Sequence, residues 1–338
     1  MLINFFLMVV MPFLLSFAIQ LLVIRFSRNT AFCIDCSKDD KPQRFHDIPT
    51  SRAGGVGIFF ASAISLCFSG MDGAYILAAA SPAFFAGLYE DVRTNIPPKL
   101  RLFIMSLGAV VSIILLDTII YDTGLFRLPL WAAVPFSVFA ITGVTNAINI
   151  IDGFNGLASG VSIISLVFFI AVSLIYENYF ILNVCIVSVS AITGFFVLNF
   201  PKGKIFLGDG GAYYIGFILV VISILIINRI PQVSPLFPVA VLIYPIFEVL
   251  FSIYRRKVKR SHSPLKADRI HLHSLIHMRL SKNNPKTSVY ILPFVLAVDV
   301  VAFGVSTNTF ALTALIFLFA AVYIFIYRHI VRFGARSF

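Results

Sequence analysis

The stretch GAYYIGFILVVISILIIN, residues 211–228, contains no charged side chain along its whole length. A helix that crosses a bilayer needs about 20 consecutive, mostly apolar residues. Residues 211–228 therefore predict a membrane-spanning helix. Turn residues lie on both sides of it, with Pro201 and Gly203 before it and Pro231 and Pro235 after it, and such residues favour chain breaks.

Comparable windows recur from one end of the chain to the other, so the sequence predicts an all-α polytopic bundle of about 10–11 transmembrane helices. The predicted spans are 3–24, 54–70, 74–90, 101–120, 131–150, 158–176, 179–199, 211–228, 236–254, 288–306 and 309–327. No long repeat and no large polar segment interrupts them. Residues 1–338 are accordingly expected to form a single membrane domain.

The composition agrees with a lipid-embedded chain. The 338 residues are 59% hydrophobic and 12% charged, and 36 of them are Phe, whereas soluble domains are roughly a quarter charged. Cys33 and Cys36 have the spacing of a metal or redox pair, but no second pair accompanies them. We therefore expect free thiols.

The basic residues predict how the chain is oriented, because cytoplasmic loops are enriched in Lys and Arg. With the N-terminus outside and the C-terminus in the cytoplasm, every one of the 26 basic residues except Arg127 and Arg229 faces inward. The net charge of +11 then belongs to a rim beside anionic lipid, and we expect no nucleic-acid partner. The cytoplasmic loops would be about 25–53, 90–101, 151–157, 200–210 and 255–287.

Carboxylates gather at the cytoplasmic ends of the predicted spans: Glu90, Asp91, Asp152, Asp209 and Glu248. Ionisable groups at membrane depth usually face a cavity or the bundle interior. Acids at one face, surrounded by basic loops, indicate a site for a divalent cation and a phosphorylated substrate. An ion-coupled transporter that uses these acids as a cation path is the alternative. It would place acids near mid-membrane, in matched halves of the chain.

The segment NAINIIDGFNGLASG, residues 146–160, places Asn146, Asn149 and Asp152 at intervals of three. On a helix this spacing puts them on one face. The following Gly153 and Gly156 predict an open turn that approaches a ligand. Carboxylate oxygens are ligands for Mg²⁺, which also takes phosphate oxygens. For Asn146 the alternative is a hydrogen bond that joins two helices.

Two further segments carry similar chemistry. Asp209 lies between glycines at an expected helix start, downstream of Lys204, and helix starts favour anions. In the loop before residue 288, Arg269, His271 and His273 suggest anion binding. Zinc ligation by His271, His273 and His277 is the alternative, although no Cys is near.

Taken together, RFHDIPTSRAGG (44–55), GLYED (87–91), NAINIIDGFNGLASG (146–160), FLGDGGAYYIGF (206–217) and DRIHLHS (268–274) resemble the polyprenyl-phosphate N-acetylhexosamine-1-phosphate transferases. The resemblance covers about residues 40–275, in order and spacing. It implies transfer of a sugar-1-phosphate from a UDP-N-acetylamino sugar to undecaprenyl phosphate, with release of UMP, at the bacterial inner membrane. The loop PTSRAGG is similar to that of the initiators of O-antigen and common antigen. The resemblance does not identify the sugar, and it does not decide whether the protein forms a homodimer.

The resemblance also implies roles for particular residues. Mg²⁺, with Mn²⁺ as a second choice, would be held by Asp209 and Asp152, and Glu90 and Asp91 would complete the catalytic acids. The substrate-binding residues would be Arg44, His46, Thr50, Arg52, Asn146, Asn149, Lys204, Arg269, His271 and His273. The chain departs from the family pattern at Glu90, Asn155 and Ser274.

Overall fold

The protein is described by a computed structural model that covers residues 5–30, 33–35, 50–68, 70–93, 96–257 and 270–333. Its first elements are η1 (Phe6–Val10), α2 (Met11–Thr30), β1 (Ile34–Asp35), β2 (Thr50–Ser51), α3 (Gly54–Cys67), α4 (Met71–Arg93), α5 (Pro98–Leu116) and α6 (Leu130–Ile151). The remaining elements are α7 (Leu157–Ile175), α8 (Tyr179–Asn199), α9 (Gly208–Arg229), α10 (Leu236–Val241), α11 (Ile243–Arg255), α12 (Leu272–Ile276), η3 (His277–Ser281), α13 (Asn284–Gly304) and α14 (Thr309–Phe333). The expected all-α membrane fold is confirmed.

Nine helices in the described part of the chain are long and apolar enough to cross a membrane. Two of the predicted spans differ from this pattern. The span at 54–70 is the shorter helix α3, of 14 residues. The span at 236–254 is broken into α10 and α11 at Leu242. Pro245 explains this break, because it has no N–H to donate to the carbonyl of Val241, four residues earlier.

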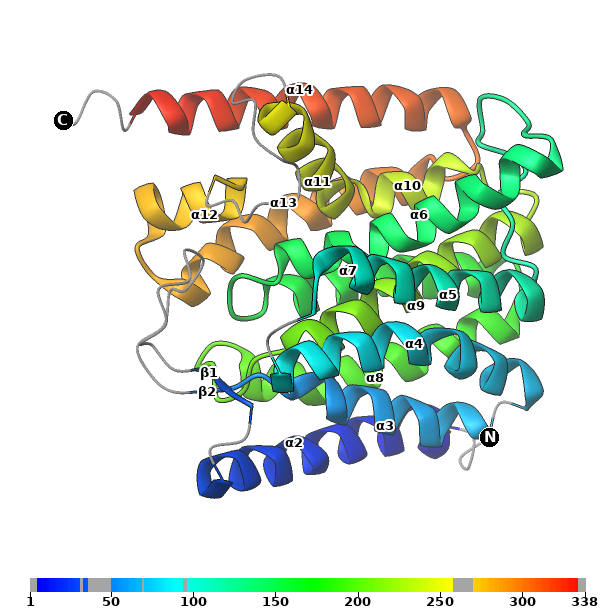
Figure 1. The fold of residues 1–338 in the computed structure, drawn as a ribbon. Helices are drawn as coiled ribbons and strands as arrows, with labels where there is room; N and C mark the ends of the chain where they lie inside the picture. The colour runs from blue at the N-terminus through cyan, green and yellow to red at the C-terminus, as the bar shows by residue number, and fades with distance from the viewer. Residues whose placement is uncertain are drawn as a thin grey trace.

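Helix α9, which contains the stretch quoted at the outset, is the centre of the bundle. Of its most apolar window, 94% is buried inside the protein, against 17% for the first and last spanning helices. Figure 1 shows α2 and α14 at opposite edges of the bundle. A helix that is apolar on all sides is expected in an interior, and lipid-facing helices are expected at the periphery.

The loops that carry the candidate residues meet at one end of the bundle. Figure 1 shows β1, β2 and α12 at that end, where α14 also finishes, whereas α2 starts near the opposite end. β1 pairs with β2 in antiparallel fashion, with Ile34 opposite Ser51. The start of α2 and the end of α14 therefore lie at opposite ends of the bundle.

Candidate active site at one end of the bundle

The sequence predicts fourteen site residues, and three of them, Arg44, His46 and Arg269, lie outside the described residues. The others lie in the last turns of α4 and α6 and just after α6, in the first turn of α9 and the loop before it, in β2 and the residue after it, and at the start of α12. Each of these places is near the same end of the bundle (Figure 1).

The first motif is joined to the start of α9 by main-chain hydrogen bonds. Phe206 N donates to Ser51 O at 2.8 Å, Gly54 N donates to Phe206 O at 3.0 Å, and Gly55 N donates to Leu207 O at 2.9 Å. These bonds fix the residue between them, Arg52, beside Asp209. Segments about 150 residues apart in the chain therefore form one surface.

Two glycines allow α4 and the loop at β2 to approach α9 this closely. A Cβ at Gly87 would collide with the backbone of Asp209, so α4 contacts α9 through main-chain atoms there. Gly208 has a φ of +74°, and a Cβ on it would meet Arg52 O and Asp91 Oδ2. The glycines of GLYED and FLGDGG are thus explained by close backbone contact.

Asp91 lies against the first turn of α9. Its Oδ1 accepts a hydrogen bond from Asp209 N at 3.0 Å and its Oδ2 accepts one from Gly210 N at 2.9 Å. The side chain is 1% exposed and lies 3.5 Å from Arg52 Nη2. A carboxylate at a helix start satisfies backbone donors that have no partner in the helix and is favoured by the helix dipole.

Asp209 is held between two arginines. Its Oδ1 lies 3.3 Å from Arg52 Nη2 and its Oδ2 accepts a hydrogen bond from Arg101 Nη1 at 2.7 Å. Arg101 also lies 3.8 Å from Glu90 Oε1, and Glu90 Oε2 accepts a hydrogen bond from Ile96 N. The Asp209 side chain is 13% exposed, so a ligand can still contact its carboxylate.

Asp152 ends α6 and belongs to the same electrostatic group. Burial and then the negative charge of Asp209, opposed by Arg52, together raise the pKa of its carboxyl to about 7. Glu90, Asp91, Asp152 and Asp209 face the guanidinium groups of Arg52 and Arg101. Four carboxyl groups thus face two guanidinium groups, and a cation would balance the excess negative charge.

The polar stripe on α6 serves two purposes. Asn149 Nδ2 donates to the hydroxyl of Tyr213 on α9 at 3.2 Å, which is a helix-joining contact of the kind considered above as the alternative for Asn146. Asn146 lies one turn earlier and is partly buried. Thr50 is buried in β2, and the side chain of Lys204 is exposed. Within the stripe, Asn149 thus joins α6 to α9, and Asp152 belongs to the group of acids around Asp209.

The turn after Asp152 is packed, which corrects the expectation of an open turn. Phe154, Asn155 and Gly156 are all buried. Asn155 N donates to Asn284 Oδ1, Asn155 Nδ2 donates to Pro201 O, and Gly156 N donates to Asn199 Oδ1. Neighbouring segments thus fill the space around residues 154–156, whereas Gly153 stays partly exposed.

A second cluster is formed by Glu248 on α11 with His271 and His273. His271 Nδ1 lies 3.1 Å from Glu248 Oε2, His273 Nδ1 lies 3.7 Å from Oε1, and Leu272 N donates to Oε1 at 3.1 Å. Burial raises the pKa of Glu248, but the histidine contacts outweigh it and hold the pKa well below its usual range. Burial lowers the pKa of His273 against the opposing effect of Glu248.

The two clusters meet at the turn after Asp152. A Cβ placed on Gly153 would lie 3.7 Å from Nε2 of His273. The ring of Phe154 lies edge-on to that of His273, with centroids 5.7 Å apart, and 5.0 Å from the ring of His277. The loop of α12 therefore completes the site that α4, α6 and α9 begin.

Sequence reasoning did not select Arg101, Tyr213 or Glu248 as site residues. Arg101 counted as one more loop base, yet it follows the pair of prolines that starts α5, which directs it back to Glu90 and Asp209. Glu248 was recognised as one of the gathered acids, but its histidine partners are 23 and 25 residues away in sequence. No periodic pattern joins such positions.

The donor set bears on the expected metal. Within the described ranges, no three His, Cys, Asp or Glu side chains converge to hold a metal ion. This finding does not support zinc held by His271, His273 and His277. Mg²⁺ is commonly bound through one or two carboxylates together with water and phosphate oxygens, so Asp209 and Asp152, with surplus negative charge around them, fit that ion.

Comparisons with known proteins agree with this geometry. The family model "Glycosyl transferase family 4" matches residues 74–227, which include the ends of α4 and α6 and the start of α9. A probable undecaprenyl-phosphate N-acetylglucosaminyl 1-phosphate transferase of Bacillus subtilis is 28% identical over 88% of this chain and 86% of its own length.

Two other relatives extend the likeness. An undecaprenyl-phosphate alpha-N-acetylglucosaminyl 1-phosphate transferase of Thermotoga maritima is 26% identical over 80% of this chain and 81% of its own length. A phospho-N-acetylmuramoyl-pentapeptide-transferase of Rubrobacter xylanophilus is 36% identical, over 36% of this chain and 37% of its own length. Residues 74–227 thus match glycosyl transferase family 4, and most of the chain is similar to undecaprenyl-phosphate N-acetylglucosaminyl 1-phosphate transferases.

Proposed function

We propose that the protein transfers a sugar-1-phosphate from a UDP-N-acetylamino sugar to undecaprenyl phosphate and releases UMP. One observation carries the proposal: Asp209, at the start of the buried helix α9, lies among Arg52, Arg101 and Asp152. Such a group of acids and guanidinium groups suits a diphosphate and its counter-ion. The names of the relatives supply the substrate class.

The reaction is a single in-line displacement. An oxygen of the acceptor phosphate attacks the β-phosphorus of the UDP-sugar, the bond from that phosphorus to the bridging oxygen breaks, and UMP leaves with the bridging oxygen. A phosphate monoester has a second pKa near 6, so the acceptor is largely a dianion at neutral pH. No base is then required, which agrees with the use of both Asp91 oxygens by backbone donors.

Mg²⁺ on Asp209 and Asp152 would supply charge stabilisation for the diphosphate and for leaving UMP. Arg52 and Arg101 bind Asp209 in this structure and are placed to contact phosphate oxygens once the substrate enters. In phosphoryl transfer, positioning and electrostatic stabilisation do most of the catalytic work. The residues of the cluster provide both.

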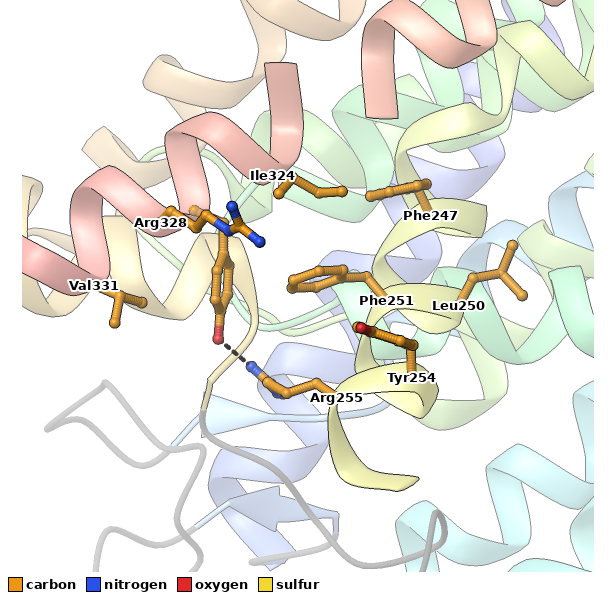
Figure 2. A pocket seen from close by; sticks show the side chains of 9 residues that line it. Phe247, Leu250, Phe251, Tyr254, Arg255, Ile324, Arg328 and Val331 are labelled. Atoms are coloured by element: carbon orange, nitrogen blue, oxygen red, sulfur yellow. Dashed lines mark hydrogen bonds between the residues drawn. The ribbon is translucent and has the colours of Figure 1, made fainter. Parts of the chain in front are cut away.

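The acceptor's hydrocarbon chain would lie in the groove between α11 and α14, which has a volume of about 810 Å³. Figure 2 shows the side chains that line it. The apolar ones are Phe247, Leu250, Phe251, Ile324 and Val331. Arg255 also lines the groove and donates to Ile270 O, one residue before His271. The groove therefore reaches the segment that carries the histidines.

The groove assignment has its own test. Leu250→Trp narrows the groove and is expected to raise KM for undecaprenyl phosphate while KM for the UDP-sugar stays unchanged. Leu14→Trp on α2, at a side chain of comparable exposure (50% against 54%), is the matched control. Equal effects of the two variants on KM for undecaprenyl phosphate would contradict binding of the acceptor's hydrocarbon chain in this groove.

The decisive experiment is an assay of purified protein with undecaprenyl phosphate, Mg²⁺ and a panel of UDP-sugars, scored by UMP release. Turnover with one N-acetylated sugar would identify the donor, and its cell-surface glycan would follow from that sugar. Absence of UMP release with every donor would contradict the proposal. The transporter alternative predicts acids along a path across the bundle, whereas Glu90, Asp91, Asp152, Asp209 and Glu248 belong to the two adjoining clusters.

A further inference from the structure

The carboxylate of Glu248 serves two histidines at once. Its side chain is 1% exposed, and an isolated buried carboxylate is costly unless hydrogen bonds satisfy it. His271 Nδ1 lies 3.1 Å from Oε2, Leu272 N donates to Oε1, and His273 Nδ1 lies 3.7 Å from Oε1. Every one of these contacts comes from the segment of α12.

The two imidazoles are nearly parallel. Their ring centroids are 5.2 Å apart with an interplanar angle of 3°. Both rings turn Nδ1 toward Glu248, and Nε2 of His273 lies beside Gly153. Because Nδ1 and Nε2 are on opposite sides of the ring, Nδ1 contacts with Glu248 leave Nε2 of each histidine for another partner.

The hydroxyl of Tyr244, on the same helix as Glu248, lies 3.5 Å from His273 Nδ1. A hydroxyl can donate or accept, whereas an ionised carboxylate only accepts. Because an ionised carboxylate 3.7 Å from Nδ1 favours a proton there, we expect His273 to carry its proton on Nδ1, with the Tyr244 hydroxyl as an acceptor. Tyr323 on α14 is the other titratable group beside Glu248.

The same helix also fixes the backbone ahead of His271. Arg255, two turns after Glu248, donates from Nη1 to Ile270 O and to the Tyr327 hydroxyl; Figure 2 shows the latter bond. The histidine segment is thus attached to α11 at Ile270 and at Leu272. Its rings keep their orientation relative to the Asp152 turn.

We propose that Glu248 is a positioning residue of the transferase: it holds His271 and His273 as Nδ1–H tautomers and presents both Nε2 atoms to the substrate. The proposal rests on the proposed function for the identity of that substrate. A neutral imidazole of this tautomer accepts a hydrogen bond at Nε2. The group it recognises is therefore a substrate donor, such as a sugar hydroxyl or the N–H of an acetamido group or uracil.

The tautomer can be measured without turnover. Solid-state ¹⁵N spectra of histidine-labelled protein in lipid, at a pH where imidazole is neutral, distinguish Nδ1–H from Nε2–H rings. His271→Asn and His273→Asn assign the two signals by subtraction. Two Nδ1–H rings are the expected result. An Nε2–H ring at either position overturns the assignment for both.

Variants then link the tautomer to activity. Gln has one accepting oxygen and one donating NH₂, so Glu248→Gln cannot accept from both His271 Nδ1 and Leu272 N. We expect kcat to fall by about 10- to 100-fold, as for other groups that orient a histidine, with a changed ¹⁵N signal of His271. Glu177→Gln, the same change at an exposed turn residue, is the control and should match the unaltered protein.

The possible outcomes separate the two proposals. Unaltered protein that releases no UMP contradicts the proposed function, while its ¹⁵N spectrum still tests the role of Glu248. Normal kcat and unchanged histidine signals in a folded Glu248→Gln protein overturn the positioning role and leave the transferase assignment intact. If Glu248→Gln does not fold, the spectrum of the unaltered protein decides.

Discussion

The carboxylate of Asp91 accepts a hydrogen bond from the backbone N–H of Asp209 at 3.0 Å, and its second oxygen accepts one from Gly210 N. Two acids that sequence reasoning placed in one catalytic group are therefore different in kind. Asp91 completes the start of α9, and Asp209 projects from that start toward the arginines. Substitutions at the two positions should separate these roles.

Asp91→Asn should lower thermal stability as well as activity. The amide has one accepting oxygen, so one of the two backbone N–H groups at the start of α9 loses its acceptor. A buried donor without a partner costs about 1–3 kcal/mol. The melting temperature in detergent, followed by a thiol-reactive or light-scattering assay, is the measurement. Lost turnover at an unchanged melting temperature would instead place Asp91 in the chemistry.

Asp209→Asn should leave the fold intact and nearly abolish turnover. The backbone of residue 209 still donates to Asp91, whereas the charge that would hold Mg²⁺ is gone. Loss of metal charge stabilisation is worth several kcal/mol, which corresponds to about a thousandfold in rate. UMP release across a Mg²⁺ titration is the measurement. Turnover near that of the unaltered protein in saturating Mg²⁺ would contradict Asp209 as the leading ligand.

Asn155→Asp should destabilise the protein, although an open turn at 153–156 would predict tolerance. Asn155 Nδ2 donates to Pro201 O at 3.2 Å, and a carboxylate would turn an oxygen toward that carbonyl in a buried place. We expect a loss of about 1–3 kcal/mol in the free energy of unfolding. Asn178→Asp is the matched control, because Asn178 only accepts, from Ile181 N, at the start of α8. If both variants melt alike, the turn is looser than its contacts indicate.

Asp299→Val should raise thermal stability without changing turnover. Asp299 on α13 is 0% exposed, and within the described part of the chain neither carboxylate oxygen has a hydrogen-bond partner. Replacing a buried, unsatisfied polar group with an apolar one of similar size removes that cost. The melting temperature and kcat of the variant are the measurements. A lower melting temperature would reveal a bound proton, ion or water that Asp299 needs.

The orientation of the bundle can be checked by reporter fusion. Since all basic residues except Arg127 and Arg229 belong to the predicted inward loops, a reporter after Phe338 should be active on the cytoplasmic side. A control fusion within 122–128, at the predicted outer loop, should give the opposite signal. An external C-terminus would contradict the arrangement with eleven passes.

Hydropathy predicted most of the helices because the apolar windows are long and the turn residues between them are strong signals. It did not predict the break at Leu242, where the window 236–254 is mostly apolar but Pro245 removes a helical hydrogen bond. Average hydropathy is insensitive to a single missing donor. The shortness of α3 was missed for a related reason, since apolar residues continue beyond its last turn.

Much of the candidate site was predictable because its acids stand next to glycines at helix ends. The partners of those acids were not. Arg101 meets Asp209 across 108 positions of sequence, and Asn149 meets Tyr213 across 64. Such pairs depend on how α4, α5, α6 and α9 pack, and residue type alone does not encode that packing. The burial of Asn155 was hidden for the same reason, because its partners are Pro201, in the loop after α8, and Asn284 and Ser288 of α13.

The burial of α9 on every side has a consequence for how the protein experiences its lipid. Membranes differ in hydrocarbon thickness, and helices in contact with lipid respond by tilting. Since α2 and α14 are the least buried spans and α9 the most buried, we expect α2 and α14 to take up that adjustment, and α9, whose first turn contains Asp209, to be shielded from lipid. We therefore expect the arrangement at Asp209 to be insulated from bilayer thickness, and the groove formed by α11 and the peripheral α14 to be the part that a thinner or thicker membrane reshapes.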